Sequence, residues 1–182
     1  MSKLVELTER KQFRVLLNPV RQDILHLLRR VGRPMTANGV ADRMSLSPIS
    51  AQGHLKKLAD LGVVIEEEHT TRSGRKVPCY SEADVEIGLG MGKKDMFQGE
   101  REALAANIVD GTFRGLLDTV HAHDETDLDE YSLMRFGVLH LSPQEREELL
   151  EMIRNYLKTH GMPEEENVEH WEYVLMTYRA NE

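Results

Sequence analysis

Cysteine is almost absent from this chain of 182 residues, in which Cys79 is the single thiol. One thiol cannot form an internal disulfide or a zinc site built from several thiolates. We interpret Cys79 as a small, partly buried packing residue and not as a redox sensor. The sequence also has no apolar run near the roughly 20 residues that a membrane-spanning helix needs, and no basic-then-apolar leader. We therefore expect a cytoplasmic protein with no membrane partner.

Catalytic motifs are missing as well. The sequence has no Gly-rich phosphate-binding loop, no nucleophile elbow, no His-Glu-x-x-His pair and no pair of carboxylates suited to acid–base catalysis. These absences argue against an enzyme and against a cofactor. An enzyme that carries its activity in the C-terminal half, with DNA as its substrate or tether, is an alternative from another class.

Positive charge is scarce overall but unevenly distributed. The net charge is −8 at pH 7, with 23 Lys and Arg against 31 Asp and Glu. Residues 1–82 nevertheless carry 14 Lys and Arg against 9 Asp and Glu, whereas residues 83–182 carry 9 against 22. A basic half joined to an acidic half is typical of a phosphate-binding module attached to a part that stays off the nucleic acid.

The most informative stretch runs from residue 46 to residue 62. Ser47 and Pro48 are typical of a helix start, because serine can accept from an unpaired backbone N–H and proline has none to satisfy, and Gly62 supplies the stop. Apolar residues recur between them at the spacing of one helix face: Ala51, Leu55, Leu58 and Leu61. The opposite face is small at its start and basic further on, which suits a DNA major groove. Its candidate DNA contacts are Ser47, Ile49, Ser50 and Gly53 near base edges, and Lys56 and Lys57 near phosphates.

A β-hairpin is predicted directly after this helix 47–61. Residues 63–65 begin a strand-forming run, and residues 77–80 are typical of a returning strand. Pro78 has no N–H for a ladder, so we expect the returning strand at a sheet edge. A helix followed by a cationic ribbon, the wing at residues 70–77, predicts a winged helix-turn-helix. The wing cations, expected to hold phosphates or enter the minor groove, are Arg72, Arg75 and Lys76.

Helices are predicted over residues 4–17, 19–31 and 37–44, ahead of the helix 47–61. The second begins at Asn18 and Pro19 and ends at Gly32, and the third is capped by Thr36. A short helix, a tight turn and a longer helix make a helix-turn-helix unit. Three arginines of the second helix are expected to be exposed: Arg21, Arg29 and Arg30.

Two stretches resemble the ArsR-like winged helix-turn-helix transcriptional regulators. Residues 17–25 (LNPVRQDIL) are similar to the opening helix signature of that family, and residues 53–64 are similar to the end of its recognition helix. The resemblance covers residues 10–82 and implies DNA binding by a dimer whose terminal helices pair. The sequence departs from the family at Gln52, where serine is frequent, and at Ser45, where glycine is common. Residues 37–42 lack the Cys-x-Cys pair of the metal-sensing members, so that sensor is absent.

The acidic half begins with a predicted connector at residues 83–92, followed by a long helix over about residues 93–120. The apolar stripe of this helix is broader than a surface helix needs, which favours pairing with a second chain over packing within its own domain alone. Ser142 and Pro143 start a further helix, with a capping box completed by Glu145. Strands at residues 131–141 and 168–178 would complete a small α/β domain, although an amphipathic helix is the alternative for 168–178.

Aromatic residues make up only 5% of the chain but gather in this half. One hypothesis is a pocket for an apolar or cationic small-molecule effector, and the favoured alternative is ordinary core packing. The candidate ligand-binding residues are Phe113, Tyr131, Phe136, Trp171 and Tyr173.

Residues 121–130 contain potential metal ligands among several acids. His121 and His123 are two residues apart, so their side chains diverge on a helix, and the segment lacks the spacing of a calcium-binding loop. We interpret it as a solvated acidic loop and expect no metal site. A metal-responsive regulator that uses these two histidines is the alternative.

The sequence thus predicts an α+β protein with a winged helix-turn-helix DNA-binding domain at residues 1–82, a connector at 83–92 and a dimerisation and effector-sensing domain at 93–182. The predicted function is a homodimeric transcriptional regulator, a repressor, that binds double-stranded DNA. A winged-helix protein–protein interaction module is the alternative, in which case the cations would face an acidic partner.

Overall fold

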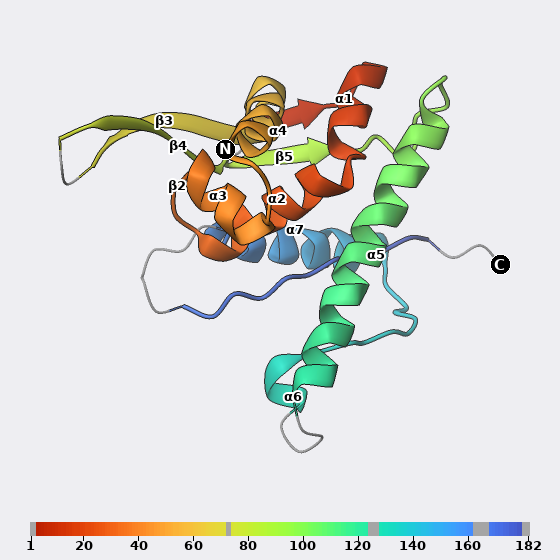
Figure 1. Cartoon of the computed structure of the whole chain (residues 1–182). Helices are drawn as coiled ribbons and strands as arrows, with labels where there is room; N and C mark the ends of the chain where they lie inside the picture. The colour runs from red at the N-terminus through yellow and green to blue at the C-terminus, as the bar shows by residue number, and fades with distance from the viewer. Residues whose placement is uncertain (1–2, 72–73, 124–127, 162–167, 180–182) are drawn as a thin grey trace. The chain divides into compact units, whose positions relative to one another are not determined.

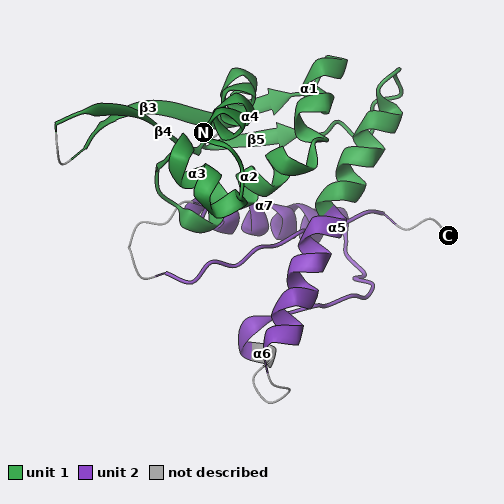
Figure 2. Ribbon diagram, in the orientation of Figure 1, with its two compact units in different colours: residues 1–108 green, residues 109–182 purple. Residues whose placement is uncertain are grey.

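The computed structural model describes residues 3–71, 74–123, 128–161 and 168–179. The chain forms two compact units, residues 1–108 and residues 109–182 (Figure 2). The division into a DNA-binding domain, a connector and a C-terminal domain, with boundaries at residues 82 and 92, stays a prediction. No helix within the described ranges is both long and apolar enough to cross a membrane.

Unit 1 holds all the strands of the described residues and most of the helices (Figure 1). In chain order it contains β1 (Lys3–Glu6), α1 (Arg10–Leu16), α2 (Pro19–Val31), β2 (Met35–Thr36), α3 (Ala37–Met44), α4 (Pro48–Leu61), β3 (Val64–Thr70), β4 (Lys76–Glu82), β5 (Val85–Gly88) and the first part of α5 (Gln98–Ala122). Unit 2 contains the rest of α5, then α6 (Leu128–Tyr131) and α7 (Pro143–Thr159). The mixed helix and strand class predicted from the sequence is therefore confirmed.

The predicted starts and stops of α2 and α3 are confirmed. The Asn18 side chain accepts from the backbone N–H of Arg21 at 3.2 Å, and the Thr36 hydroxyl accepts from the backbone N–H of Gly39 at 3.1 Å. Gly32 ends α2 with a φ of 61°, a left-handed conformation that favours glycine. Local capping chemistry thus sets the ends of both helices.

The core of unit 1 lies between its helices and the three-stranded sheet. Its largest fully buried side chains come from α1, α2, α3, α4 and β4: Phe13, Ile24, Leu28, Val40, Leu55, Leu58 and Tyr80. Burial of each large apolar side chain contributes roughly 1.5–3 kcal/mol, so this cluster dominates the stability of the unit. The apolar residues that recur at helical spacing in residues 19–31 and 47–61 pack in or against this core.

The expectation that β4 lies at a sheet edge is wrong. The strand order is β2-β4-β3, so β4 is central, and Pro78 lies opposite Glu68 of β3. The other neighbour, β2, pairs only with Cys79 and Tyr80. Because β2 ends before it reaches Pro78, the missing proline donor costs no ladder hydrogen bond on that side.

The helix predicted over residues 4–17 is shorter than expected. Residues 3–6 form β1, which pairs in parallel with β5, from Lys3 opposite Val85 to Glu6 opposite Gly88. This pairing also places a strand inside the predicted connector 83–92. Gly88 lies close to Leu4 there, since a Cβ atom would be 3.1 Å from Cδ1 of Leu4, so a larger residue would require a small shift of that side chain.

Arg21 is buried, contrary to the expectation that it is exposed. Its side chain is 8% exposed, and its Nε and Nη2 donate to the carbonyls of Val15 and Arg14 at 2.6 Å and 2.7 Å. These carbonyls belong to the last turn of α1, where unpaired acceptors need a donor. Arg21 is therefore a cap that joins α1 to α2, and it is unavailable to phosphates.

Unit 2 confirms one predicted helix and contradicts both predicted strands. The backbone N–H of Ser142 donates to Glu145 at 2.8 Å and that of Glu145 donates to the Ser142 hydroxyl at 3.3 Å, so the capping box of α7 is present. The described residues of 132–141 and 168–179 form neither strand nor helix. A strand needs a hydrogen-bonding partner as well as strand-forming residues, and neither segment has such a partner strand within the described chain.

The loop before α5 is anchored to the start of α5 by a charged pair, and Phe13 of α1 packs beside it. Arg101 is 2% exposed, and its Nη1 and Nη2 donate to the two carboxylate oxygens of Asp95 at 2.5 Å and 2.7 Å. The Arg101 guanidinium lies 5.7 Å from the centre of the Phe13 ring, which also contacts Phe97 at 5.6 Å between centroids. Hydrogen bonds from Arg101 and from the backbone of Phe97 lower the pKa of Asp95 to about 2.

Asp95→Asn should lower Tm at pH 7, because it leaves the buried Arg101 charge without its counterion. The pKa of Asp95 is depressed on folding, so its contribution is present above the ordinary value of 3.8 and is lost as the pH falls towards 2. The Tm difference between wild type and variant should therefore shrink over that range in a calorimetric pH series. Asp110→Asn, which removes an exposed carboxylate from its pair with Arg114, serves as the control and should change Tm little. A pH-independent Tm difference would contradict this account of the pair.

Candidate nucleic-acid interface

Helix α4 has the ends that its sequence predicts. The Ser47 hydroxyl accepts from the backbone N–H of Ser50 at 3.1 Å, and Pro48 occupies the first turn. Gly62 ends the helix with a φ of 82°, and its N–H donates to the last turn of α4. The Ser47 hydroxyl is thus committed in part to capping, which limits its use for contacts outside the protein.

The turn between α3 and α4 explains one departure from the resembled family. Ser45 has a φ of 53°, and no other described residue besides glycine has a positive φ. Glycine adopts this conformation without a steric cost, whereas other residues adopt it at a cost of roughly 1–2 kcal/mol. The position where the family commonly has glycine is therefore a left-handed turn in this chain.

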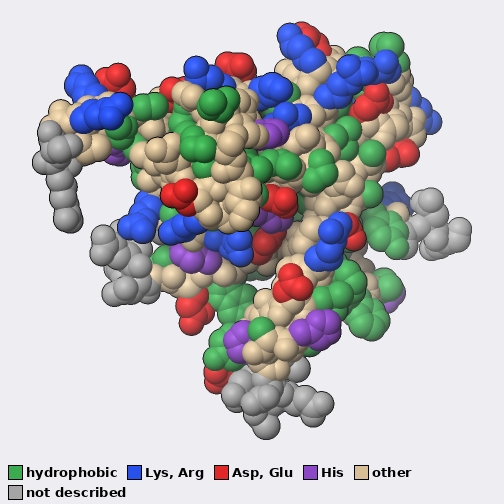
Figure 3. Space-filling view, viewed as in Figure 1, with side chains coloured by type: hydrophobic (Ala, Val, Ile, Leu, Met, Phe, Trp, Pro, Cys, Tyr) green, Lys and Arg blue, Asp and Glu red, His purple; other side chains and the backbone are tan. Residues whose placement is uncertain are grey.

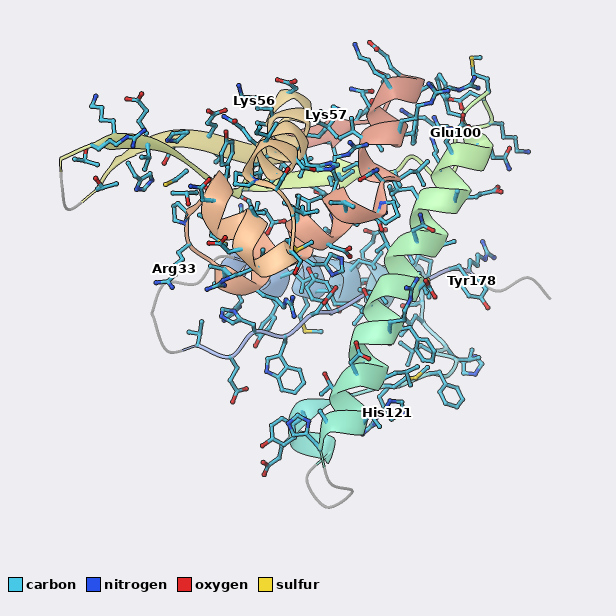
Figure 4. The ribbon with its side chains drawn as sticks, viewed as in Figure 1. Arg33, Lys56, Lys57, Glu100, His121 and Tyr178 are labelled. Carbon is cyan, nitrogen blue, oxygen red and sulfur yellow. The ribbon has the colours of Figure 1, made fainter. Side chains whose placement is uncertain are left out.

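One face of α4 is completely buried, and this burial determines which residues face outward. Ala51, Leu55 and Leu58 are each 0% exposed. Five of the six predicted contact residues on α4 are exposed, and Ser50 is half-buried: the exposed ones are Ser47, Ile49, Gly53, Lys56 and Lys57. Ile49 is 84% exposed, so its side chain is available for contacts outside the core. Figure 4 shows Lys56 and Lys57 on this helix.

Gln52 is an exposed residue of this face that the predicted contact set omitted. It lies three residues after Ile49 and four before Lys56, so helical spacing places it between them. A glutamine amide can donate and accept at once, which is the pattern needed to bind an adenine edge in the major groove. The spacing alone could have identified it.

His54 occupies the boundary between the buried and outward faces. Its Nδ1 atom is buried without a hydrogen-bond partner in the described structure. Burial, together with the positive charges of Arg21 and Lys57, lowers the pKa of His54. The ring is therefore neutral at pH 7, and the charge of this face comes from its lysines.

The wing is an antiparallel hairpin of β3 and β4 that extends from the helices of unit 1 (Figure 1). Its end is closed by hydrogen bonds from Thr71 N–H to the Arg75 carbonyl at 2.8 Å and from Gly74 N–H to the Thr71 carbonyl at 2.9 Å. Lys and Arg side chains gather near this end in Figure 3. Arg75 and Lys76 are exposed, as predicted, whereas Arg72 lies outside the described residues.

Acidic residues on β3 reduce the positive charge of the wing. Glu66, Glu67 and Glu68 are all exposed, and Glu68 lies 3.4 Å from Lys76 Nζ. The Lys76 charge is thus partly compensated, which the sequence prediction did not anticipate because it assigned no register to the hairpin. Among the wing cations of the described residues, Arg75 lies closer than Lys76 to the end of the hairpin.

The candidate ligand-binding aromatics lie on unit 2 and are exposed. Their exposed fractions run from 46% for Tyr131 to 95% for Phe136, with Phe113, Trp171 and Tyr173 between these values. An effector pocket lined by them stays a prediction.

The two histidines considered as metal ligands lie at the end of α5 and just beyond it. His121 belongs to the last turn of the helix, so the predicted loop begins later than residue 121, and residues 124–127 of that loop lie outside the described residues. His123 Nδ1 lies 2.8 Å from the Thr119 carbonyl, and its ring stacks on Tyr131 at 3.9 Å between centroids. Within the described part of the chain, no group of three or more His, Cys, Asp or Glu residues could hold a metal ion.

Comparison with known proteins identifies one similar family. A family described as a helix-turn-helix domain matches residues 16–67, which span α2, α3, α4 and the start of β3. A search of curated proteins finds no match.

Among solved structures, a possible transcriptional regulator from Methanosarcina mazei Go1 shares 13% identity and a TM-score of 0.35, over 59% of this chain and 84% of that one. A protein from the thermoacidophilic archaeon Sulfolobus tokodaii shares 18% identity and a TM-score of 0.33, over 58% of this chain and 93% of that one. Scores at this level do not establish a common fold.

Gly53→Ala should raise the free energy of unfolding by about 0.5–1 kcal/mol, because glycine in a helix interior is destabilising by that amount. A Cβ atom at Gly53 would meet no heavy atom within 4 Å, so there is no packing penalty. Urea unfolding measures the change.

Gly39→Ala in α3 is the matched control. Its Cβ would lie 3.4 Å from the capping hydroxyl of Thr36, so a smaller gain is expected. Destabilisation by Gly53→Ala would show that the outward face of α4 is covered within the chain.

Proposed function

We propose that this chain is a DNA-binding transcriptional regulator similar to the ArsR-like winged helix-turn-helix proteins, acting as a homodimeric repressor. One observation carries the proposal. Within the segment that matches a helix-turn-helix family, α4 has a fully buried face and an exposed face that is small and apolar near Ile49 and cationic near Lys57. The repressor role and the cytoplasmic location rest on the family resemblance and on composition.

The dimensions of α4 fit a major groove. Its 14 residues give a length of roughly 21 Å, and a helix of about 10–12 Å diameter enters a groove about 12 Å wide. Ile49 offers an apolar surface for a thymine methyl group, and Gly53 lets the helix backbone approach the base edges closely. Lys56 and Lys57 lie one to two turns further along, where they would pair with phosphates and set the docking angle.

The wing extends the proposed contact to neighbouring phosphates. Arg75 and Lys76 lie near the end of the hairpin, with Arg72 between β3 and β4 in the sequence. Contacts to DNA phosphates fix the register of the protein on the duplex and add affinity, but they do not read the base sequence. We assign residues 1–82 to DNA binding, 83–92 to a connector and 93–182 to dimerisation and effector sensing.

Dimerisation would place two copies of α4 on one operator. Helix α5 exposes large apolar side chains, and Phe113 and Leu117, which are four residues apart and so share one face, are 47% and 37% exposed. A two-fold dimer presents its recognition helices to half-sites about 34–36 Å apart, one turn of DNA. The exposed stripe supports pairing of two chains along this helix.

A protein–protein interaction module is the second candidate function. The acidic run Glu66–Glu68 on the wing and the net charge of −8 favour it, because both oppose binding to a polyanion. An affinity measurement with a duplex at moderate salt separates the two, since an interaction module would not bind the duplex.

Lys57→Glu should reduce affinity for a selected duplex at least about 100-fold, because each subunit loses a phosphate contact and gains a repulsive charge. Fluorescence anisotropy with a duplex obtained by in vitro selection measures this loss. Lys158→Glu makes the same charge change on the exposed surface of α7 and should bind like the wild type. Equal losses in both variants would point to net charge rather than to a contact of α4.

Arg75→Ala should weaken binding to specific and unrelated duplexes by the same factor. It should also reduce the slope of log K against log salt by about 1 per subunit, since one phosphate contact is lost. The salt series is compared with that of Arg154→Ala, whose side chain donates within α7. A slope unchanged from that control would remove Arg75 from the interface.

A further inference from the structure

We propose that residues 132–141 and 168–178 of one chain form β-strands with the same two segments of a second copy, so that unit 2 acquires its core only in the dimer. This inference deepens the homodimer of the proposed function by naming the segments that join the copies. It concerns unit 2 alone, and its test needs no DNA.

The first observation is that unit 2 has no core in the single chain. None of the residues from Val109 to Arg179 whose side chains the structure describes is buried, although many of them are large and apolar. The large apolar side chains of the two segments are between 38% exposed at Val174 and 95% exposed at Phe136. A soluble protein rarely leaves a surface of this kind uncovered.

The second observation is the size of the exposed surface. The chain exposes 14082 Å². Two separate compact bodies of the sizes of units 1 and 2 would together expose only roughly 10,800 Å², about 3,300 Å² less than the whole chain exposes. Obligate dimers commonly bury about 1,000–2,500 Å² on each chain, so the excess is large enough for a stable dimer interface.

The third observation is that both segments have strand-forming sequences but belong to no sheet. Residues 132–141 include Phe136, Val138 and Leu139, and residues 168–178 include Tyr173 and Val174. Apolar residues fall on both alternating faces of each segment, as in strands that are covered on both sides. Backbone N–H and C=O groups in such an apolar environment need ladder partners, and no partner strand lies within the described chain.

A second copy supplies partners that match in length and charge. The segments contain 10 and 11 residues, so as strands they would span roughly 33–36 Å each. Residues 132–141 contain Arg135 and no acid, whereas residues 168–178 contain Glu169 and Glu172 and neither Lys nor Arg. Pairing of unlike segments across a two-fold axis is therefore favourable in charge. It also occurs twice, which closes the dimer without leaving both segments open to further chains.

The test uses the full-length chain without DNA, in sedimentation velocity and in amide hydrogen exchange followed by mass spectrometry. The expected species has twice the 20.9 kDa mass of one chain. In that dimer, amides of residues 133–141 and 168–178 should exchange at least about 100-fold more slowly than unstructured peptides do. A monomer at micromolar concentration, or a dimer in which both segments exchange without protection, would overturn the proposal and leave the surface to another partner or to α5.

Two variants separate strand pairing from general instability. Leu139→Pro removes a ladder donor and Phe136→Glu places a charge in the proposed interface, so each should weaken dimerisation at least tenfold and abolish protection in both segments. Met91→Glu, an equal change at an exposed apolar residue of unit 1, should leave both readouts unchanged. Unaltered dimerisation in both segment variants would also overturn the proposal.

Anisotropy with a selected duplex, measured on the same samples, keeps this inference distinct from the proposed function. A strand-paired dimer that binds no duplex would contradict the proposed function alone. A chain that binds a duplex but leaves both segments unprotected would contradict the strand pairing alone.

Discussion

The burial of Ala51, Leu55 and Leu58 is the constraint on which the functional account depends. Because these three side chains are fully buried, a rotation of α4 about its axis would expose large apolar surface and bury charge. The outward direction of Ile49, Gly53 and Lys57 is therefore determined by the core and not by a ligand. A surface presented in this way is preorganised, so binding to it costs little conformational entropy.

Much of unit 1 was predictable because its signals are local. Ser47 with Pro48, and Asn18 with Pro19, specify helix starts within four residues of chain, and Gly32 and Gly62 specify the ends. The exposed residues of α4 follow from 3.6-residue periodicity once its buried stripe is known. Gln52 was predictable by the same argument, because helical spacing places it between Ile49 and Lys56 on the exposed face.

The predictions that failed depend on partners distant in the sequence. Pairing of β1 with β5 replaced the first part of the helix predicted over residues 4–17, and the short length of β2 allowed Pro78 into a central strand. Arg21 is buried because α1 ends beside it, which periodicity within α2 cannot indicate. Residues 132–141 and 168–178 have strand composition without a strand partner, so their sequence indicates a tendency that one chain does not satisfy. Composition indicates which secondary structure a segment favours, but a strand forms only where a partner strand lies beside it.

The central claim is that the outward face of α4, together with the end of the wing, contacts the DNA duplex. Backbone amide chemical shifts of the full-length chain, recorded by NMR during titration with a selected duplex, test it most directly. The account predicts perturbations concentrated at residues 49–57 and 74–76, with α7 unaffected. Perturbations confined to other elements, or none at a duplex concentration well above micromolar, would contradict it.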